Sequence, residues 1–293
     1  MHKTIEKLLE NGPVVTDGAW GTQLQLRGLK PGACPDEWNL TNPDKVEAVA
    51  RDYVEAGSQI ILTNTFGSSP LMLGSYELAD KAWEINRAGA AISARAAAGK
   101  AKVFASMGPC GKLLLAGDVT EAEIEDSFSM QAEALQAGGA DGLVIETMSD
   151  TAEAEIALRC AKRTGLPVVA CMVYDSGPDM QRTMMGTTVT DAVVALTEAG
   201  ADVIGANCGQ GVEGFVALSR SLKAATHLPV WIKANAGLPT LVNAKVHYDS
   251  TAEKFCESVP AILTEGADFI GGCCGTTPDY IRAVRTLLDN QKT

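Results

Sequence analysis

The sequence predicts an α/β fold, a single-domain (β/α)8 TIM barrel that takes up the whole chain, residues 1–293. Three observations predict it. Eight short apolar runs recur along the chain, and helical periodicity follows each of them. Several runs are entered through the same small and acidic turn, as in Gly139-Ala140-Asp141. No strand–GxGxxG–helix fingerprint supports the competing architecture, which is a doubly wound open sheet.

The eight predicted strands follow one another at intervals that leave room for a helix between each pair. They are residues 13–17, 59–64, 102–107, 142–146, 167–173, 201–205, 229–235 and 268–270. Glycines end several of the intervening helices, and Leu-Pro introduces the fifth and seventh strands. Parallel strands with right-handed crossovers place all eight carboxyl ends on one rim, where barrel enzymes build their sites. The longer loops leave this rim, and two of them, 175–185 and 243–248, are hypothesised to be lids.

Composition excludes several classes of function. The chain is 46% hydrophobic and 20% charged, as in an ordinary globular protein, and its net charge is −12. That balance argues against a nucleic-acid surface and against a polybasic membrane contact. The apolar runs are too short to cross a bilayer, and residues 1–7 are expected to enter an amphipathic helix and not a signal peptide. The eight cysteines are therefore expected in a reducing cytoplasm, where metal or catalytic roles outrank disulfides.

Two adjacent cysteines stand between glycines at the end of the eighth predicted strand, in residues 271–275. Neighbouring side chains in a strand point to opposite faces, so Cys273 and Cys274 reach one point only where the backbone turns. Flanking glycines permit that turn. A third cysteine, Cys208, follows the sixth predicted strand. Three thiolates at strand ends predict a zinc site with one open coordination position, whereas the competing interpretation is three small buried hydrophobic residues.

Other polar residues end strands on the same rim. Asp17 and Glu146 suit a pair that binds an ammonium group, or else are helix caps; Asn235 is either a turn residue or a ligand contact. Three aromatic residues are interpreted either as lining for a pocket that takes a methylated donor or as packing: Trp20, Trp38 and Tyr76.

The remaining cysteines are predicted to be structural, with Cys110 on a loop that reaches the rim: Cys34, Cys110, Cys160, Cys171 and Cys256. The three histidines lie in places that disfavour a histidine-based triad: His2, His227 and His247.

Zinc held by three cysteines has a specific chemistry. A fourth thiolate that binds such an ion has a lowered pKa and stays anionic near neutral pH. It can then attack an electrophilic methyl group, which is activation of a nucleophile and not of water. A carboxylate beside a bound ammonium group and backbone N–H groups beside a bound carboxylate would hold an amino-acid thiol in place.

The same motifs resemble the homocysteine S-methyltransferase family, in the right order and over nearly the whole chain. They are residues 17–22 (DGAWGT), 63–66 (TNTF), 146–150 (ETMSD), 205–208 (GANC), 234–237 (ANAG) and 271–278 (GGCCGTTP). Within that family the sequence is more similar to the homocysteine-binding barrel of cobalamin-dependent methionine synthase than to betaine–homocysteine methyltransferase. The resemblance implies that zinc-bound homocysteine thiolate accepts a methyl group to give methionine.

The family's functional residues map onto this sequence by motif. The resemblance implies zinc ligands at Cys208, Cys273 and Cys274. It implies homocysteine contacts at six further residues: Asp17, Gly18, Ala19, Thr63, Glu146 and Asn235.

The methyl donor is left open by the sequence. The chain stops just after the predicted barrel, so no folate or cobalamin domain of its own is expected. The donor is then a small methylated compound, such as S-methylmethionine or a betaine, or a methyl-folate or methyl-corrinoid (methylcobalamin) carried by a separate protein. The closer match to methionine synthase favours the corrinoid. Two alternatives remain: a corrinoid-linked methyltransferase whose acceptor is not homocysteine, and an inactive barrel that serves as an interaction subunit. Formation of a homo-oligomer is also left open.

Overall fold

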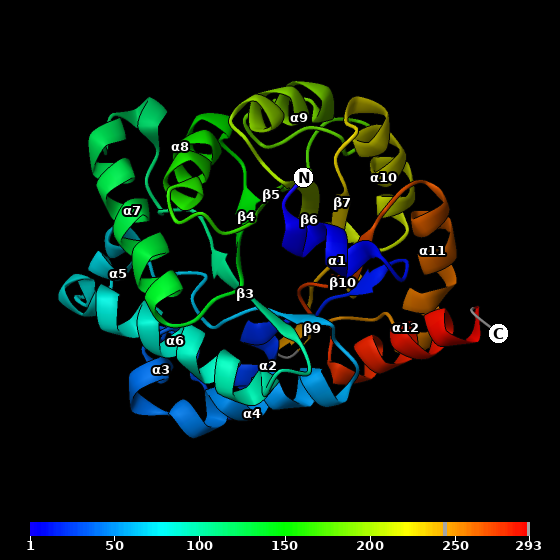
Figure 1. Ribbon diagram of the computed structural model, residues 1–293, viewed down its shortest axis with the longest axis horizontal. Coiled ribbons are helices and arrows are strands. Elements are labelled where there is room, and N and C mark those ends of the chain that lie inside the picture. The colour runs from blue at the N-terminus through cyan, green and yellow to red at the C-terminus, as the bar shows by residue number, and fades with distance from the viewer. Residues whose placement is uncertain (243–244, 292–293) are drawn as a thin grey trace.

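Eight parallel strands form a nearly closed barrel in the computed structural model, which describes residues 1–242 and 245–291 (Figure 1). The strand order around the barrel is β1-β10-β7-β6-β5-β4-β3-β2. In chain order the barrel strands are β1 (Val14–Val15), β2 (Ile60–Ile61), β3 (Lys102–Met107), β4 (Gly142–Met148), β5 (Val168–Met172), β6 (Val203–Gly211), β7 (Val230–Asn235) and β10 (Phe269–Gly272). All eight predicted strands and the predicted barrel are confirmed.

The first and second strands close the barrel with few hydrogen bonds. Each is only two residues long. The backbone N–H of Gln59 donates to the Val15 carbonyl over 2.8 Å, and the Gln59 side-chain oxygen accepts from the Val15 N–H over 3.1 Å. Side chains make the same kind of contact at other strand starts, where Asp141, Asp202 and Asp268 accept from the N–H groups of Val103, Val168 and Val230.

Most of the helices surround the strands on the outside of the barrel, and the first lies across one end of it (Figure 1). They are α1 (Lys3–Leu9), α2 (Trp20–Leu26), α3 (Trp38–Thr41), α4 (Pro43–Glu55), α5 (Pro70–Gly74), α6 (Ala82–Ala97), α7 (Glu121–Ala137), α8 (Thr151–Lys162), α9 (Val189–Glu198), α10 (Gly214–Ala225), α11 (Ala252–Thr264) and α12 (Pro278–Asn290), with short 3-10 helices at Ala79–Lys81 and Leu114–Ala116. Their starts follow local rules: α7 opens with a capping box between Thr120 and Glu123, and α12 has proline at its first position. Among the described helices, none has the length and apolar character that crossing a membrane requires.

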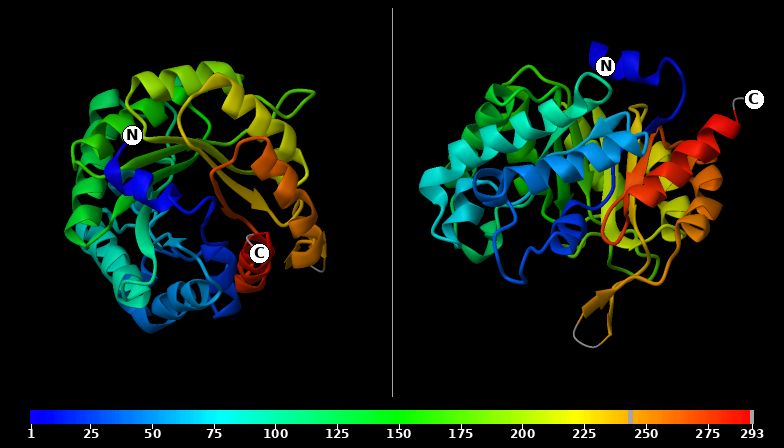
Figure 2. Two further views of the ribbon diagram at one scale, coloured as in Figure 1. Left: turned by 45° about the vertical axis from the view of Figure 1, so that its right-hand side comes forward. Right: turned by 90° about the horizontal axis from the view of Figure 1, so that it is seen from below.

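Aromatic side chains fill the inside of the barrel. Trp231 stacks on Phe104 with ring centroids 6.3 Å apart, and it packs against Phe269 at 5.2 Å. Ile5 of α1 belongs to the same buried cluster, and α1 covers the amino-terminal end of the barrel (Figure 2). The barrel is therefore plugged at that end, and the carboxyl ends of the strands are left to form a site.

A β-hairpin stands on the carboxyl-terminal side, where the sequence predicted only a loop. Its strands are β8 (Thr240–Val242) and β9 (Lys245–His247), which pair antiparallel. The hairpin projects from the body at the end opposite α1 (Figure 2, right). The hypothesised lid at 243–248 falls partly on residues 243 and 244, which lie outside the described residues. The other hypothesised lid, 175–185, is bridged to itself through Ser176 and Arg182.

Candidate metal centre and its pocket

Three cysteines meet at the carboxyl-terminal rim. Cys208 lies near the end of β6, while Cys273 and Cys274 directly follow β10. All three sulfur atoms lie within 4.8 Å of one another, and the Cys208 and Cys274 sulfurs are 3.8 Å apart. All eight cysteines are free, and the other five do not belong to this group; four of those five are buried. The sulfurs that the sequence placed at strand ends thus converge on one point.

The backbone turns sharply after β10 and so presents both cysteines. The Cys273 N–H donates to the Ala234 carbonyl over 2.7 Å, and the Ala236 N–H donates to the Cys274 carbonyl over 2.9 Å. The Thr276 hydroxyl then donates to the Cys273 carbonyl over 2.7 Å and accepts from the Ala19 N–H over 3.2 Å. A β-carbon at Gly272 would lie only 2.3 Å from that hydroxyl. Glycine is therefore required at 272, because a side chain there would displace the threonine that fixes the turn.

The three thiols share protons and favour one anion. Hydrogen bonds from the Cys273 and Cys274 thiols hold the pKa of Cys208 well below its ordinary range. Hydrogen bonding to Cys208 raises the pKa of Cys273 and of Cys274. A divalent cation bound there would displace the protons that the thiols hold.

The donor set fits zinc. Thiolates are soft ligands that favour zinc among the common divalent ions. The Asn235 amide is hydrogen-bonded to the Cys208 thiol, and its side-chain oxygen is buried with no hydrogen-bond partner. Such an orphaned oxygen costs free energy unless it finds a partner. Three sulfurs with an unsatisfied amide oxygen beside them are what a tetrahedral ion with one exchangeable ligand needs.

The two predicted carboxylates have different environments. The Asp17 carboxylate accepts hydrogen bonds from the Trp20 indole N–H at 2.8 Å and from the Leu62 N–H at 2.7 Å. It also forms a buried ion pair with the Lys233 ammonium group. Asp17 is thus hydrogen-bonded and paired within the protein, and its sharing of a bound ammonium group with Glu146 stays a prediction.

Besides Asp36, Glu146 is the carboxylate that lines the cavity. One of its oxygens accepts from the Ser106 hydroxyl, and the Ser106 N–H donates to the Thr63 hydroxyl over 3.0 Å. Burial raises the pKa of Glu146, and the nearby Lys233 charge opposes that rise. Lys233 escaped the sequence analysis. The signal that could have found it is a lysine in an otherwise apolar strand run, 229–235.

A cavity of roughly 400 Å3 contains the three cysteines and Glu146. Of the other predicted contacts, Gly18, Ala19 and Thr63 line it, whereas Asp17 and Asn235 do not. Lys233 is the single basic residue among the described residues that line it. The outer part is aromatic and apolar, with four residues that line it: Trp20, Phe66, Met72 and Tyr76. The alternative that Trp38 lines the pocket is wrong, because it packs on the core with the Lys45 ammonium group 4.8 Å above its ring.

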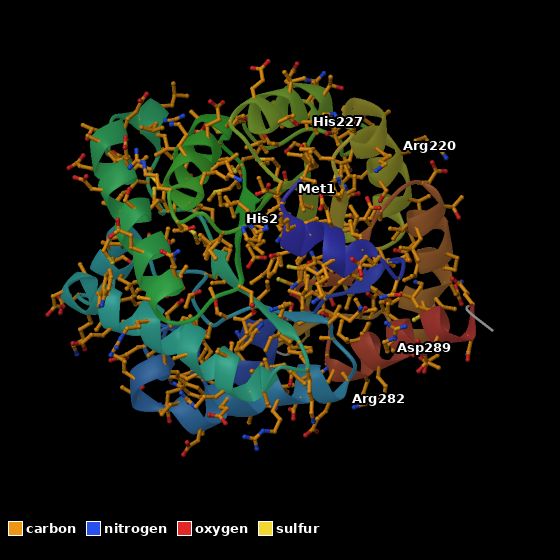
Figure 3. The ribbon with its side chains drawn as sticks, in the orientation of Figure 1. Met1, His2, Arg220, His227, Arg282 and Asp289 are labelled. Atoms are coloured by element: carbon orange, nitrogen blue, oxygen red, sulfur yellow. The ribbon has the colours of Figure 1, made fainter. Side chains whose placement is uncertain are left out.

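Two of the three histidines lie at the other end of the barrel. His2 caps α1, where its ring nitrogen accepts from the Thr4 N–H over 3.2 Å. His227 lies in the loop that enters β7 from α10 (Figure 3). Both are therefore remote from the thiols, and the His247 side chain lies outside what the structure describes.

Comparisons with known proteins agree with this geometry. Residues 14–288 match the family model described as homocysteine S-methyltransferase. A methionine synthase of Mycobacterium tuberculosis is 34% identical over 97% of this chain, and one of Mycobacterium leprae is 33% identical over 94%. The chain spans about a quarter of the length of these relatives, 25% and 24%.

A solved structure is similar over the whole chain. The metallated form of the homocysteine methyltransferase MmuM from Escherichia coli matches with a TM-score of 0.81, at 22% identity. The match covers 97% of this chain and 99% of that one. At that identity the likeness establishes the fold alone, namely the barrel on which the cysteines are carried.

Proposed function

The chain belongs to the homocysteine S-methyltransferase family, a family of methyltransferases, and from that premise we propose that it methylates the thiol sulfur of homocysteine to give methionine. One observation carries the proposal. The thiols of Cys208, Cys273 and Cys274 lie within 4.8 Å of one another, in a cavity that Glu146 also lines. A thiol-activating site and an ammonium-binding carboxylate in one cavity suit an amino-acid thiol.

We assign Cys208, Cys273 and Cys274 as the ligands of a zinc ion. When bound, zinc lowers the pKa of the substrate thiol and keeps its sulfur anionic at neutral pH. The three cysteines would hold the ion, and the buried Asn235 amide, hydrogen-bonded to the Cys208 thiol, would orient that ligand.

Glu146 is assigned to the substrate ammonium group. Asp17 is paired with Lys233, and Asp36, which also lines the cavity, accepts hydrogen bonds from Ser68 and Gly67, so we assign the positive group to Glu146. Gly18, Ala19 and Thr63 form the wall beside it. A β-carbon at Gly18 would lie 2.8 Å from both the Thr276 hydroxyl and the Tyr53 hydroxyl, so the backbone itself faces the ligand there. These contacts orient the sulfur towards the methyl donor.

The bond changes are those of a displacement at carbon. The substrate thiol loses its proton to solvent on binding, the sulfur–methyl bond forms, and the bond between the methyl carbon and the donor breaks with its electron pair leaving on the donor. No oxidant or reductant is consumed. The protein's own part is to bind, orient and exclude water.

We propose that the donor is a methyl-corrinoid carried by a separate protein domain that docks on the barrel mouth. Support comes from exposed apolar residues on the loops that follow β2, β3, β5 and β7. They are Phe66, Leu113, Leu115, Met184 and Leu238. Exposed apolar residues on several neighbouring loops are typical of a protein-binding surface. The second candidate, a small methylated cation, is favoured by the aromatic outer part of the cavity, because aromatic faces attract such cations.

Titration with L-homocysteine tests the acceptor. The zinc-loaded protein should bind L-homocysteine with release of about one proton, whereas L-homoserine, which has a hydroxyl in place of the thiol, should bind far more weakly. Equal affinity for the two compounds would refute the assignment of the sulfur site. A panel of donors, with and without a methylated corrinoid protein, then separates the two donor candidates.

A further inference from the structure

Asn207 joins the metal centre to the carboxylate that faces it. It is the residue before Cys208 in β6, and its side chain is 1% exposed. Its amide reaches two other strand ends: Thr147 of β4, next to Glu146, and Cys273 after β10. In the sequence Asn207 belongs to the motif 205–208 (GANC), and no role was predicted for it.

The first contact is with a strained turn. The Thr147 N–H donates to the Asn207 amide oxygen over 2.8 Å, and the Asn207 NH2 group donates to the Thr147 hydroxyl over 2.7 Å. Thr147 has a φ of +61°, a left-handed conformation that a β-branched residue adopts only when its surroundings hold it there. The paired hydrogen bonds from Asn207 are such a restraint.

That turn decides where Glu146 points. The β4–β5 register pairs Ile145 with Ala170 and then Met148 with Met172, so β4 contains one extra residue between these pairs. Glu146 and Thr147 occupy this bulge. A bulge breaks the alternation of side chains and redirects one of them, and this one gives Glu146 its place in the cavity.

The second contact is with a sulfur. The same NH2 group lies 3.8 Å from the Cys273 sulfur, within the range of an N–H···S hydrogen bond. The following residue, Cys208, has a φ of +62°, and the β6–β7 register shifts between Asn207 and Gly211. Asn207 is thus the last residue in register before the irregular segment that presents the Cys208 thiol.

We propose that Asn207 is a positioning residue that sets the sulfur of Cys273 and the carboxylate of Glu146 relative to each other, and so fits the cavity to a thiol and an ammonium group on one molecule. The inference rests on the proposed function and deepens it. Groups that hydrogen-bond to metal ligands fix the orientation of those ligands, and removal of such a group costs about 10–100-fold in metal affinity.

Two substitutions separate the two contacts. Asn207→Ala removes both, so zinc affinity, measured by chelator competition, should fall about 10–100-fold, and homocysteine affinity of the zinc-saturated protein should fall as well. Thr147→Ala removes only the hydroxyl partner. It should leave zinc affinity unchanged and weaken homocysteine binding by about fivefold, the value of one hydrogen bond. Cobalt(II) in place of zinc adds a spectroscopic measurement: the sulfur-to-metal absorption should shift in Asn207→Ala and not in Thr147→Ala.

Asn86→Ala is the matched control. Asn86 is also buried, and its amide donates to the Ser68 and Ala82 carbonyls over 2.7 and 2.8 Å, outside the metal centre. It should leave both affinities unchanged. Unchanged affinities in Asn207→Ala and Thr147→Ala, or an equal loss in Asn86→Ala, would overturn the inference. If Asn207→Ala does not fold, Thr147→Ala decides the matter on its own. Wild-type protein that binds neither zinc nor homocysteine is a distinct result, which overturns the proposed function and this inference with it.

Discussion

Lys233, which lines the cavity, forms an ion pair with Asp17, although 216 residues separate the two in the sequence. Their side chains are 2% and 0% exposed. Burial favours the uncharged form of Lys233, but the charges of Asp17 and Glu146 outweigh it and raise the pKa of Lys233. Two carboxylates therefore lie near one ammonium group and stabilise its charge.

Breaking this pair should destabilise the fold strongly. Lys233→Met leaves Asp17 buried without its counter-charge, which typically costs about 3–5 kcal/mol. The double variant Lys233→Met with Asp17→Asn removes both charges and should recover much of that loss. Urea unfolding gives the free energies. Arg282→Met is the control, because its ion pair with Asp279 is exposed, at 56% and 79%, and it should cost less than about 1 kcal/mol. If Lys233→Met had the same free energy of unfolding as the control, the buried pair would not consist of two charged groups.

Each metal ligand should be needed for zinc and dispensable for the fold. Cys208→Ala, Cys273→Ala and Cys274→Ala should each abolish tight zinc binding and methyl transfer, since two thiolates remain. The strand ends lie outside the packed interior of the barrel, so far-ultraviolet circular dichroism should be unchanged. Zinc content after dialysis and a thermal unfolding curve measure the two effects. Cys160→Ala, at a buried cysteine outside the group, is the control for zinc content. Global unfolding of the ligand variants would indicate a structural metal instead.

Glu146→Gln should weaken amino-acid binding without removing the metal. Loss of a charge-assisted hydrogen bond costs about 1.5–3 kcal/mol, which corresponds to a homocysteine affinity roughly 10–100-fold lower. Zinc affinity should stay within about twofold of wild type, because Glu146 is not among the sulfur ligands. Calorimetric titration of the zinc-loaded variant gives the homocysteine value. Affinity equal to that of wild type would remove Glu146 from the ammonium site.

Asp36 should make stability depend on pH. Burial raises its pKa from 3.8 to about 6, even though the Ser68 hydroxyl and the Gly67 N–H both donate to it. A raised pKa means that the folded state binds the proton more tightly than the unfolded state. Protonation of Asp36 therefore contributes to the free energy of unfolding. This contribution is fully present below the pKa of the unfolded state and is lost as pH rises through about 6.

Asp36→Asn keeps an oxygen that can accept both hydrogen bonds but carries no charge. It should raise the free energy of unfolding at pH 7.5, by at most about 3 kcal/mol, and this gain should vanish at pH 4. Chemical denaturation at the two pH values measures it. The same gain at both pH values would mean that the carboxyl group does not titrate in this interval.

The periodic features of the fold were predictable because they depend on local sequence. Apolar runs of strand length between helical segments identified all eight barrel strands, and the strand ends placed Cys208, Cys273 and Cys274 on one rim. The hairpin β8–β9 was missed, since its two three-residue strands occur inside what the sequence predicted as a single long loop. Short strands that pair only with each other leave a weak periodic signal.

The sequence by itself determined the barrel, the rim and the residue types that gather there, because alternation and turn chemistry act over a few neighbouring residues. Only the tertiary structure decided which partner each of those residues has. It pairs Asp17 with Lys233 and leaves Glu146 to the cavity, and it makes the bulge at Thr147 that Asn207 holds. The physical reason is that charge pairing and strand register depend on distances between segments far apart in the chain, and local sequence patterns do not encode those distances.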